Sequence, residues 1–212
     1  YYLKNYKKND FVKIDILKKD GSIIRSFTND KNKLKINSNK PVLSNENDID
    51  YALSASNIKS INPHSGGNKL VWDMRYPGFI SFDGMVLYSS PNTGPKAVPG
   101  KYDVLLTYND LKIKKEFEVI KDPRVTNSQD EYDSQLDFLL KVRDEVSNAN
   151  QTIIDIRKIK SDLEYLKNKV SDKKQITDLI NEFKDKLEVI ENNIHMTKNQ
   201  SRQDPLNYGI RI

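Results

Sequence analysis

The chain has 212 residues, of which 36% are hydrophobic and 31% are charged, and its formal net charge is +5 at pH 7. It contains no cysteine, which excludes disulfide bonds and thiolate metal sites. No apolar run approaches the ~18 residues that a transmembrane helix requires. The composition therefore predicts a soluble protein with modest cores and room for one or two domains.

The positive charge is concentrated in the first part of the sequence. Residues 1–122 hold 20 Lys and Arg against 14 Asp and Glu, whereas residues 123–212 hold 15 against 16. Lysines such as Lys13 and Lys114 occupy alternating positions, with carboxylates such as Asp15 between them. Because nucleic-acid-binding proteins gather Lys and Arg on one face, we interpret the pattern as a solvated face and expect no nucleic-acid partner.

Short strands are predicted from the beginning of the chain. The apolar residues Val12, Ile14 and Ile16 alternate with polar ones, which is typical of a strand with one buried face. An Asp-Gly pair at 20–21 predicts a tight turn into a returning strand over 23–27. The first residues lack the basic start and apolar core of a signal peptide, and we expect the sequence to be a piece of a longer protein.

A long polar segment follows the predicted hairpin. Residues 28–63 are rich in Asn, Ser, Lys and Asp and are predicted to form an insertion at the surface. The acidic residues within 46–50 offer oxygen ligands for calcium but lack the glycine-containing spacing of a calcium loop. We therefore expect no metal site there.

Strand patterns resume after the insertion. Alternation predicts four more strands, over residues 69–75, 84–88, 102–108 and 111–120. A set of six or seven short strands with regular turn signals is typical of an immunoglobulin-like or fibronectin-like β-sandwich. We assign residues 1–122 to such a sandwich.

Several residues of this part invite a chemical interpretation, but a structural one is favoured for each. Trp72 is expected in the core, because its ring buries a large area. Asp73 and Arg75 lie two apart on one sheet face and are expected to pair with each other or with a neighbouring strand. The turn from Gly94 to Gly100 differs from a phosphate-binding loop, because its prolines remove backbone N–H donors.

No constellation of catalytic, cofactor-binding or metal-ligating residues is found. The only histidines, His64 and His195, have no second histidine at a ligand spacing. Pro123 ends the strand pattern, since proline cannot donate to a sheet ladder. We expect purely structural roles for Trp72, Asp73, Arg75, Pro77, Gly94, Pro95, Pro99, Gly100, Asp122, Pro123 and Arg124.

Downstream of Pro123 the spacing of apolar residues changes from two to three or four. This spacing predicts one helix over 129–169, capped by Asn127 or Ser128, and a second helix over 173–197. Within residues 123–200 we expect the two helices to form a long antiparallel hairpin of coiled-coil type. The fold class is thus α+β with more than one domain, and residues 201–212 are predicted to be a linker toward a further helix that is absent here.

The second helix covers only the distal part of the first. The proximal apolar stripe must then pack on a missing third helix, on the β domain or on another chain. We favour the missing helix, with self-association as the second choice. The stripe residues that we consider available for such an interaction are Tyr132, Leu136, Leu139, Val146 and Ile153.

Three segments, residues 67–77, 94–102 and 122–124, closely resemble consecutive motifs of one family of large secreted bacterial proteins. Proteins of this family are built around sortilin-like β-propellers with Asp-box repeats and are often labelled glycosyl hydrolases. The motifs belong to the region that follows the propeller. The resemblance implies a secreted or cell-surface location, and it implies that any hydrolase activity resides in an upstream propeller that this chain does not contain.

Two functional hypotheses follow. The first is a non-catalytic structural or protein-interaction module without cofactors, whose partners are other domains of the parent protein or a cell-surface protein. The alternative is a carbohydrate-binding module that assists a glycosidase. It is suggested by the aromatic residues around the turn at 77–78, which are Tyr76, Phe79, Phe82 and Tyr88.

Overall fold

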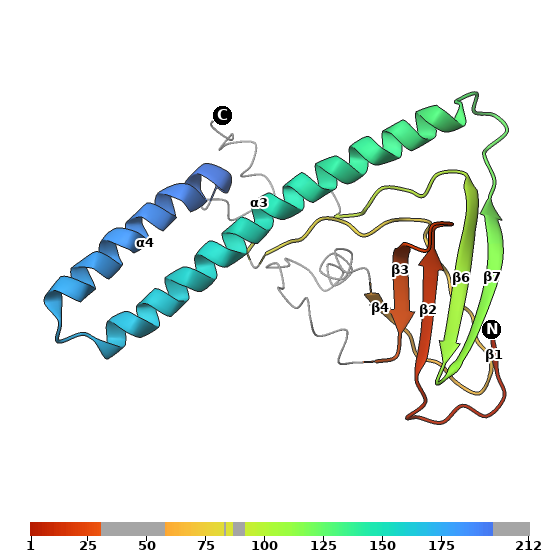
Figure 1. Ribbon diagram of the computed structural model, residues 1–212, viewed down its shortest axis with the longest axis horizontal. Coiled ribbons are helices and arrows are strands. Elements are labelled where there is room, and N and C mark those ends of the chain that lie inside the picture. Colours follow the sequence, from red (N-terminus) through yellow and green to blue (C-terminus); the bar gives the residue numbers. More distant parts are fainter. Residues whose placement is uncertain (31–57, 83, 87–91, 197–212) are drawn as a thin grey trace. The chain divides into compact units, whose positions relative to one another are not determined.

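The computed structural model describes residues 1–30, 58–82, 84–86 and 92–196 (Figure 1). Its elements are β1 (Tyr2–Leu3), β2 (Val12–Leu17), β3 (Ile23–Thr28), β4 (Ile58–Ser60), β5 (Gly66–Gly67), β6 (Gly100–Tyr108), β7 (Leu111–Val119), α3 (Gln129–Lys169) and α4 (Lys174–Ile194). Five strands form a mixed sheet in the order β4-β3-β2-β6-β7, and β1 pairs separately with β5. The chain therefore belongs to the α+β class.

The chain divides into two compact units. Among the described residues, the first unit comprises 1–30, 58–79 and 92–144, and we call it the sheet unit. The second comprises 80–82, 84–86 and 145–196, and we call it the hairpin unit. The division therefore lies within α3, whereas the sequence pattern changes at Pro123.

The hairpin predicted across residues 20–21 is confirmed, and the strands predicted over 102–108 and 111–120 pair as a second hairpin. Strands β2 and β3 pair antiparallel across a turn in which Gly21 has a φ of 87°, a conformation that glycine adopts without strain. Strands β6 and β7 pair along their full length across a turn in which Asn109 has a φ of 49°. On β2 the apolar alternation places Val12, Ile14 and Ile16 on one buried face, as the sequence indicated.

The predicted strand over residues 69–75 is wrong. Met74 adopts a φ of 56°, which turns the chain, and only Arg75 forms an isolated antiparallel bridge, to Lys96. The predicted strand over 84–88 is absent from its described part, 84–86. Its other two residues lie outside the described residues.

The polar insertion predicted at 28–63 is shorter than expected at both ends. Strand β3 reaches Thr28, and β4 pairs parallel with β3 through Ile58, Lys59 and Ser60. Residues 31–57, including the calcium candidate at 46–50, lie outside the described residues. In the part of the chain that the structure describes, the second sheet that a sandwich requires is limited to the two-residue pairing of β1 with β5.

The core of the sheet unit lies on one face of the five-stranded sheet. Its buried members are Ile14, Ile16, Ile24, Phe27, Tyr76, Tyr102 and Leu136. Leu136 belongs to the first turns of α3, and Leu140 packs against the same cluster one turn later. The proximal stripe therefore packs at Leu136 on the β domain, and our preference for a missing helix at this residue was wrong.

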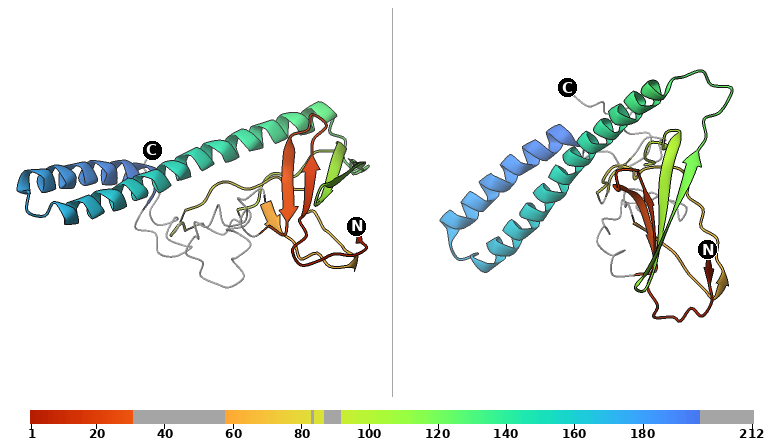
Figure 2. Two further views of the ribbon diagram at one scale, coloured as in Figure 1. Left: turned by 60° about the horizontal axis from the view of Figure 1, so that its bottom comes forward. Right: turned by 45° about the vertical axis from the view of Figure 1, so that its right-hand side comes forward.

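Both helices match their predicted ranges closely. At the start of α3, the Ser128 hydroxyl accepts the Glu131 backbone N–H at 3.3 Å, while the Glu131 carboxylate accepts the Ser128 N–H at 2.7 Å. These reciprocal bonds form a capping box, which satisfies two otherwise unpaired donors. Within the hairpin unit, α4 lies antiparallel beside the second part of α3 (Figures 1 and 2), and Ile153, Ile156, Ile180 and Leu187 are buried.

Candidate functional site

Trp72 was expected in the core; it is partly buried and packs against the core of the sheet unit, in a segment that is not a strand. Its ring meets Tyr102 and Phe117 edge-on, with 6.1 Å between ring centroids in each pair. Its indole N–H donates to the Arg75 carbonyl oxygen at 3.2 Å. A half-buried ring with a satisfied N–H holds the segment on the sheet.

Asp73 and Arg75 take part in separate polar contacts. The Asp73 carboxylate lies 3.6 Å from the Lys59 ammonium of β4, in agreement with pairing to a neighbouring strand. The Arg75 guanidinium donates to the Gly94 carbonyl at 2.8 Å. Between the two residues themselves, the Arg75 backbone N–H donates to Asp73 Oδ1 at 3.1 Å, so the side chains are used structurally.

The glycines and prolines of the second motif join two crossing segments, residues 74–79 and 92–97. The Tyr76 N–H donates to the Pro95 carbonyl at 2.8 Å, next to Gly94. A Cβ at Gly94 would lie 2.1 Å from the Tyr76 carbonyl oxygen and 2.2 Å from that of Pro77. Only glycine allows the two backbones to approach so closely.

Within the Asp122-Pro123-Arg124 segment, the first and last residues bind each other. The Arg124 guanidinium makes a two-pronged contact with the Asp122 carboxylate at 3.0 and 2.7 Å, and the Arg124 backbone N–H bonds the same carboxylate at 3.0 Å. These contacts, led by the guanidinium bond, hold the pKa of Asp122 below its usual range. The motif is a local turn between β7 and α3.

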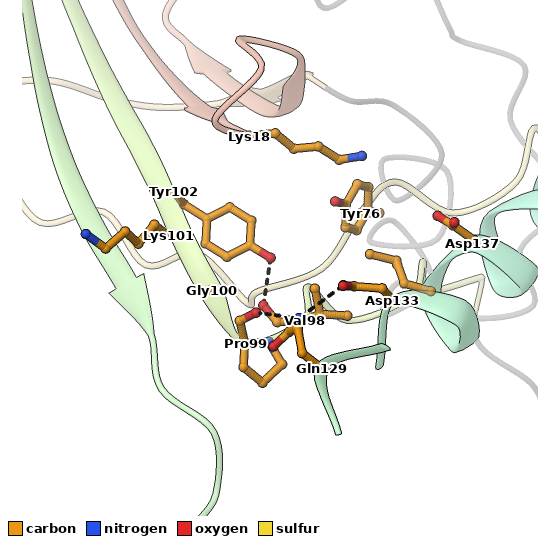
Figure 3. Close-up of a pocket in the computed structure, with 11 residues that line it drawn as sticks. Lys18, Tyr76, Val98, Pro99, Gly100, Lys101, Tyr102, Gln129, Asp133 and Asp137 are labelled. Atoms are coloured by element: carbon orange, nitrogen blue, oxygen red, sulfur yellow. Dashed lines mark hydrogen bonds between the residues drawn. The ribbon is translucent and has the colours of Figure 1, made fainter. Parts of the chain in front are cut away.

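The sheet unit contains a pocket of about 380 Å³ that several polar side chains line (Figure 3). It is bounded by the turn after β2, the start of β6 and the first turns of α3. Its lining residues are Lys18, Tyr76, Val98, Pro99, Gly100, Lys101, Tyr102, Gln129, Asp133, Leu136 and Asp137. Pro99 and Gly100, expected to be structural, therefore also line this pocket.

The polar groups of the pocket differ in how they are held. The Tyr102 hydroxyl donates to the Val98 carbonyl at 2.7 Å. Gln129 Nε2 donates to the Pro99 carbonyl and to Asp133 Oδ1, at 3.1 Å each, and so fixes one carboxylate on the pocket wall (Figure 3). Burial raises the pKa of Tyr76 well above its usual value, which keeps its hydroxyl protonated and able to donate.

The two carboxylates do not form a glycosidase pair. Asp133 and Asp137 are one turn apart on α3 and therefore belong to the same wall of the pocket. Glycoside hydrolysis uses two carboxyl groups that flank the bond to be cleaved. The arrangement can bind polar groups, but it does not enclose a bond from both sides.

The hairpin unit contains a second cluster, which the sequence did not indicate. Phe82, only 1% exposed, meets the His195 ring edge-on at 4.8 Å and lies under the Arg157 guanidinium at 4.8 Å. Glu191 is buried and accepts from Arg157 at 2.7 Å. Burial alone would raise the pKa of Glu191, but its bond to Arg157 and the positive charge there keep that pKa below its usual value.

The segment that carries Phe82 is fastened by the second part of α3. Asn150 donates to the Ile80 carbonyl at 2.6 Å, and the Ile80 N–H donates to the Ser147 hydroxyl at 3.1 Å. Asn150, a polar residue beside the apolar series of α3, was the one sequence signal of this attachment. The sequence alone could not show that Asn150 binds the Ile80 carbonyl, because the two residues are 70 positions apart.

The proposed aromatic platform for carbohydrate does not form as expected. Tyr76 is 6% exposed and Phe82 is 1% exposed, so neither ring presents a face to solvent. Phe79 is partly buried, and Tyr88 lies outside the described residues. Two of the four rings are thus unavailable for stacking on a sugar.

The residues of the proximal stripe have different surroundings. Leu136 and Ile153 are buried within the chain, and Tyr132 is partly buried. Leu139 and Val146 remain 40% and 36% exposed. Only the last two therefore offer much surface for self-association.

The charged face of the sheet unit is extensively paired. Asp103 of β6 lies 2.8 Å from Lys19 and 2.9 Å from Lys114. Glu116 of β7 lies 2.7 Å from Lys19 and 3.2 Å from Lys101. These lysines are neutralised locally, which argues against a phosphate-binding patch. The prediction of a solvated face holds only in part, because Asp15 and Asp103 are each 4% exposed.

Within the described ranges, no three His, Cys, Asp or Glu side chains gather closely enough to hold a metal ion. No helix in these ranges combines the length and apolar character needed to cross a bilayer. Comparisons with protein-family models, curated proteins and solved structures found no match to this chain.

Proposed function

We propose that this chain is a non-catalytic structural and protein-interaction module. In this proposal an immunoglobulin-like β domain and a coiled-coil-like helical hairpin follow the propeller of a secreted or cell-surface bacterial protein. The context rests on the motif resemblance described above. Any hydrolase activity of the parent protein would reside in the propeller.

The observation that carries the proposal is an apolar face of the hairpin unit that the described residues leave uncovered. On α4, Leu179, Phe183 and Ile190 are 65%, 49% and 46% exposed. On α3, Ile159 and Leu166 are 40% and 48% exposed. We call these five residues the hairpin face.

The five residues belong to one side of the hairpin. On each helix the exposed residues are displaced from the buried row by about 80–100° in the same rotational sense, at 100° per residue. Because the helices are antiparallel, equal displacements point to the same side. The hairpin thus resembles a helical bundle that lacks one member.

The occupant that fits this face is an amphipathic helix, supplied by another domain of the parent protein or by a cell-surface partner. Such a helix binds in the groove between two helices through apolar residues spaced three and four apart. The rim next to the face carries Glu182 and Lys186, which pair with each other at 2.6 Å. Because the rim carries one negative and one positive side chain that pair with each other, the partner helix does not need a large net charge.

The test compares Leu179→Glu/Phe183→Glu with Val189→Glu, a control at a 61% exposed residue on the side of α4 that faces away from the buried row. In the isolated chain the double variant should melt no lower than the unchanged chain, because it removes exposed apolar surface. In the intact parent protein, amide hydrogen exchange of α4 should be slower than in the isolated chain. The double variant should abolish this extra protection, and Val189→Glu should retain it.

Equal exchange of α4 in the intact parent and the isolated chain would refute a covered face. Concentration-dependent dimerisation of the isolated chain, abolished by the double variant, would instead identify a second copy as the occupant. Analytical ultracentrifugation distinguishes that outcome.

A further inference from the structure

The pocket of the sheet unit contains a tyrosine hydroxyl that donates to no described residue. The Tyr76 side chain is 6% exposed, and its hydroxyl points into the space between Tyr102 and Lys18 (Figure 3). Tyr102 uses its own hydroxyl on Val98, and no hydrogen bond to the Tyr76 hydroxyl occurs among the described residues. The hydroxyl of an otherwise buried side chain therefore opens into the pocket, where it is available to donate to a ligand.

The charges around the pocket come from different elements. Asp133 and Asp137 are contributed by α3, whereas Lys18 comes from the turn after β2 and lies 5.8 Å from the centre of the Tyr76 ring. Lys101 also lines the pocket, but it is already paired with Glu116 at 3.2 Å. The charges that remain for a ligand are therefore two carboxylates on one side and one ammonium on another.

We propose that this pocket binds a small zwitterion of the size of an amino acid or a dipeptide. The ammonium group of the ligand is held by Asp133 and Asp137, and its carboxylate accepts from Lys18 and the Tyr76 hydroxyl. Leu136, Val98 and Pro99 supply apolar surface for the carbon skeleton. A volume of about 380 Å³ lies at the small end of ligand pockets and matches such a ligand.

A neutral sugar fits this site less well. Sugars bind by stacking on an open aromatic face, but the Tyr76 ring is buried and Lys18 lies over it. A sugar also leaves the separated charges of Lys18 and the two aspartates without partners. The inference is independent of the proposed helix-binding face, which uses residues of the hairpin unit alone.

The test is titration of the full chain with the twenty free L-amino acids and with glycylglycine, followed by ¹H–¹⁵N NMR at Gly100 and Gln129. We expect at least one of these probes to bind. Its N-acetylated form, which lacks the ammonium, and its amide, which lacks the carboxylate, should each bind about tenfold more weakly or worse. Glucose serves as the neutral comparison.

The variant that isolates the Tyr76 hydroxyl is Tyr76→Phe, which keeps the ring in the core. It should weaken binding of the zwitterion by about fivefold to tenfold while the melting temperature stays close to that of the unchanged chain. Asp137→Asn should weaken it to a similar degree, because this exposed carboxylate is not paired with any described residue. Tyr165→Phe and Asp162→Asn, which change the same groups on α3 outside the pocket, should have no effect.

Three outcomes would overturn the proposal. One is the absence of chemical-shift changes for every probe up to about 10 mM. Another is equal binding of a probe and its N-acetylated form. The third is unchanged affinity in Tyr76→Phe, which would mean that the ligand does not contact the Tyr76 hydroxyl.

Discussion

At Trp72 one aromatic ring secures a segment that lies outside the regular strands. The ring packs edge-on against Tyr102 and Phe117. Trp72→Ala leaves a cavity beside both rings, so we predict a loss of about 2–4 kcal/mol of unfolding free energy. Urea denaturation followed by far-ultraviolet circular dichroism measures this loss.

The neighbouring residue provides the control for Trp72. Val71 is 71% exposed, and Val71→Ala should change the unfolding free energy by less than about 0.5 kcal/mol. Equal losses for the two variants would contradict a core role for the tryptophan.

His195 gives the hairpin unit a dependence on pH. Burial, and then the positive charge of Arg157, lower the pKa of His195 in the folded chain, although Glu191 opposes this shift. The folded state therefore favours the neutral ring. Stability should be fully present above the ordinary histidine pKa of about 6.5 and should decrease as the pH falls through the folded pKa.

This prediction is checked by melting temperatures between pH 7.5 and pH 5. His195→Gln should flatten the decrease, whereas His64→Gln, at an exposed histidine of the sheet unit, should leave it unchanged. An identical decrease in His195→Gln and the unchanged chain would assign the effect to other groups.

At the scale of the elements, segments 74–79 and 92–97 can cross closely only because Gly94 has no side chain. Gly94→Ala forces a Cβ against two backbone carbonyls, which cannot swing aside as a side chain can. We predict a loss of about 1–3 kcal/mol of unfolding free energy and loss of the bridge between Arg75 and Lys96. Urea denaturation and NMR measure these two effects.

Gly67→Ala is the matched control for this crossing. Its Cβ would meet no heavy atom within 4 Å. It should therefore stay within about 0.5 kcal/mol of the unchanged chain. A tolerated Gly94→Ala would show that the two segments can separate without cost.

The elements that could be predicted from the sequence are those set by local patterns. The hairpins have turn residues and alternation within one stretch of chain, and α3 has an unbroken apolar series with a cap at Ser128. Residues 69–75 alternate just as well, but alternation cannot reveal that Met74 takes a positive φ. Strand β4 escaped prediction because its pairing partner, β3, is distant in the sequence.

The candidate site could not be predicted for the same reason. Lys18, Tyr76 and Asp133 each look ordinary in their own segments. Their convergence depends on contacts between three elements that are far apart along the chain. Only the structural roles of the motif residues, which their own neighbours determine, were accessible in advance.

For the whole molecule, the formal net charge overstates the positive charge that is available to bind a nucleic acid. The excess of five positive charges would attract nucleic acid if the lysines were free. On the sheet unit, however, Lys19, Lys101 and Lys114 are paired with Asp103 and Glu116. The hydrogen bonds from Lys19 and then Lys114 hold the pKa of Asp103 below its usual range, so these pairs persist at neutral pH.

We therefore predict that the chain binds duplex DNA no more tightly than the non-specific range of about 10⁻⁴–10⁻⁶ M at physiological salt. Asp103→Asn/Glu116→Gln should tighten binding and steepen its salt dependence, because it releases the three lysines. Asp178→Asn/Glu182→Gln changes the net charge equally but releases only Lys186, so it should have a smaller effect. Fluorescence anisotropy measures the DNA affinity of each variant and its salt dependence, and circular dichroism confirms that the variants are folded. Equal effects of the two double variants would mean that total charge rather than local pairing governs binding.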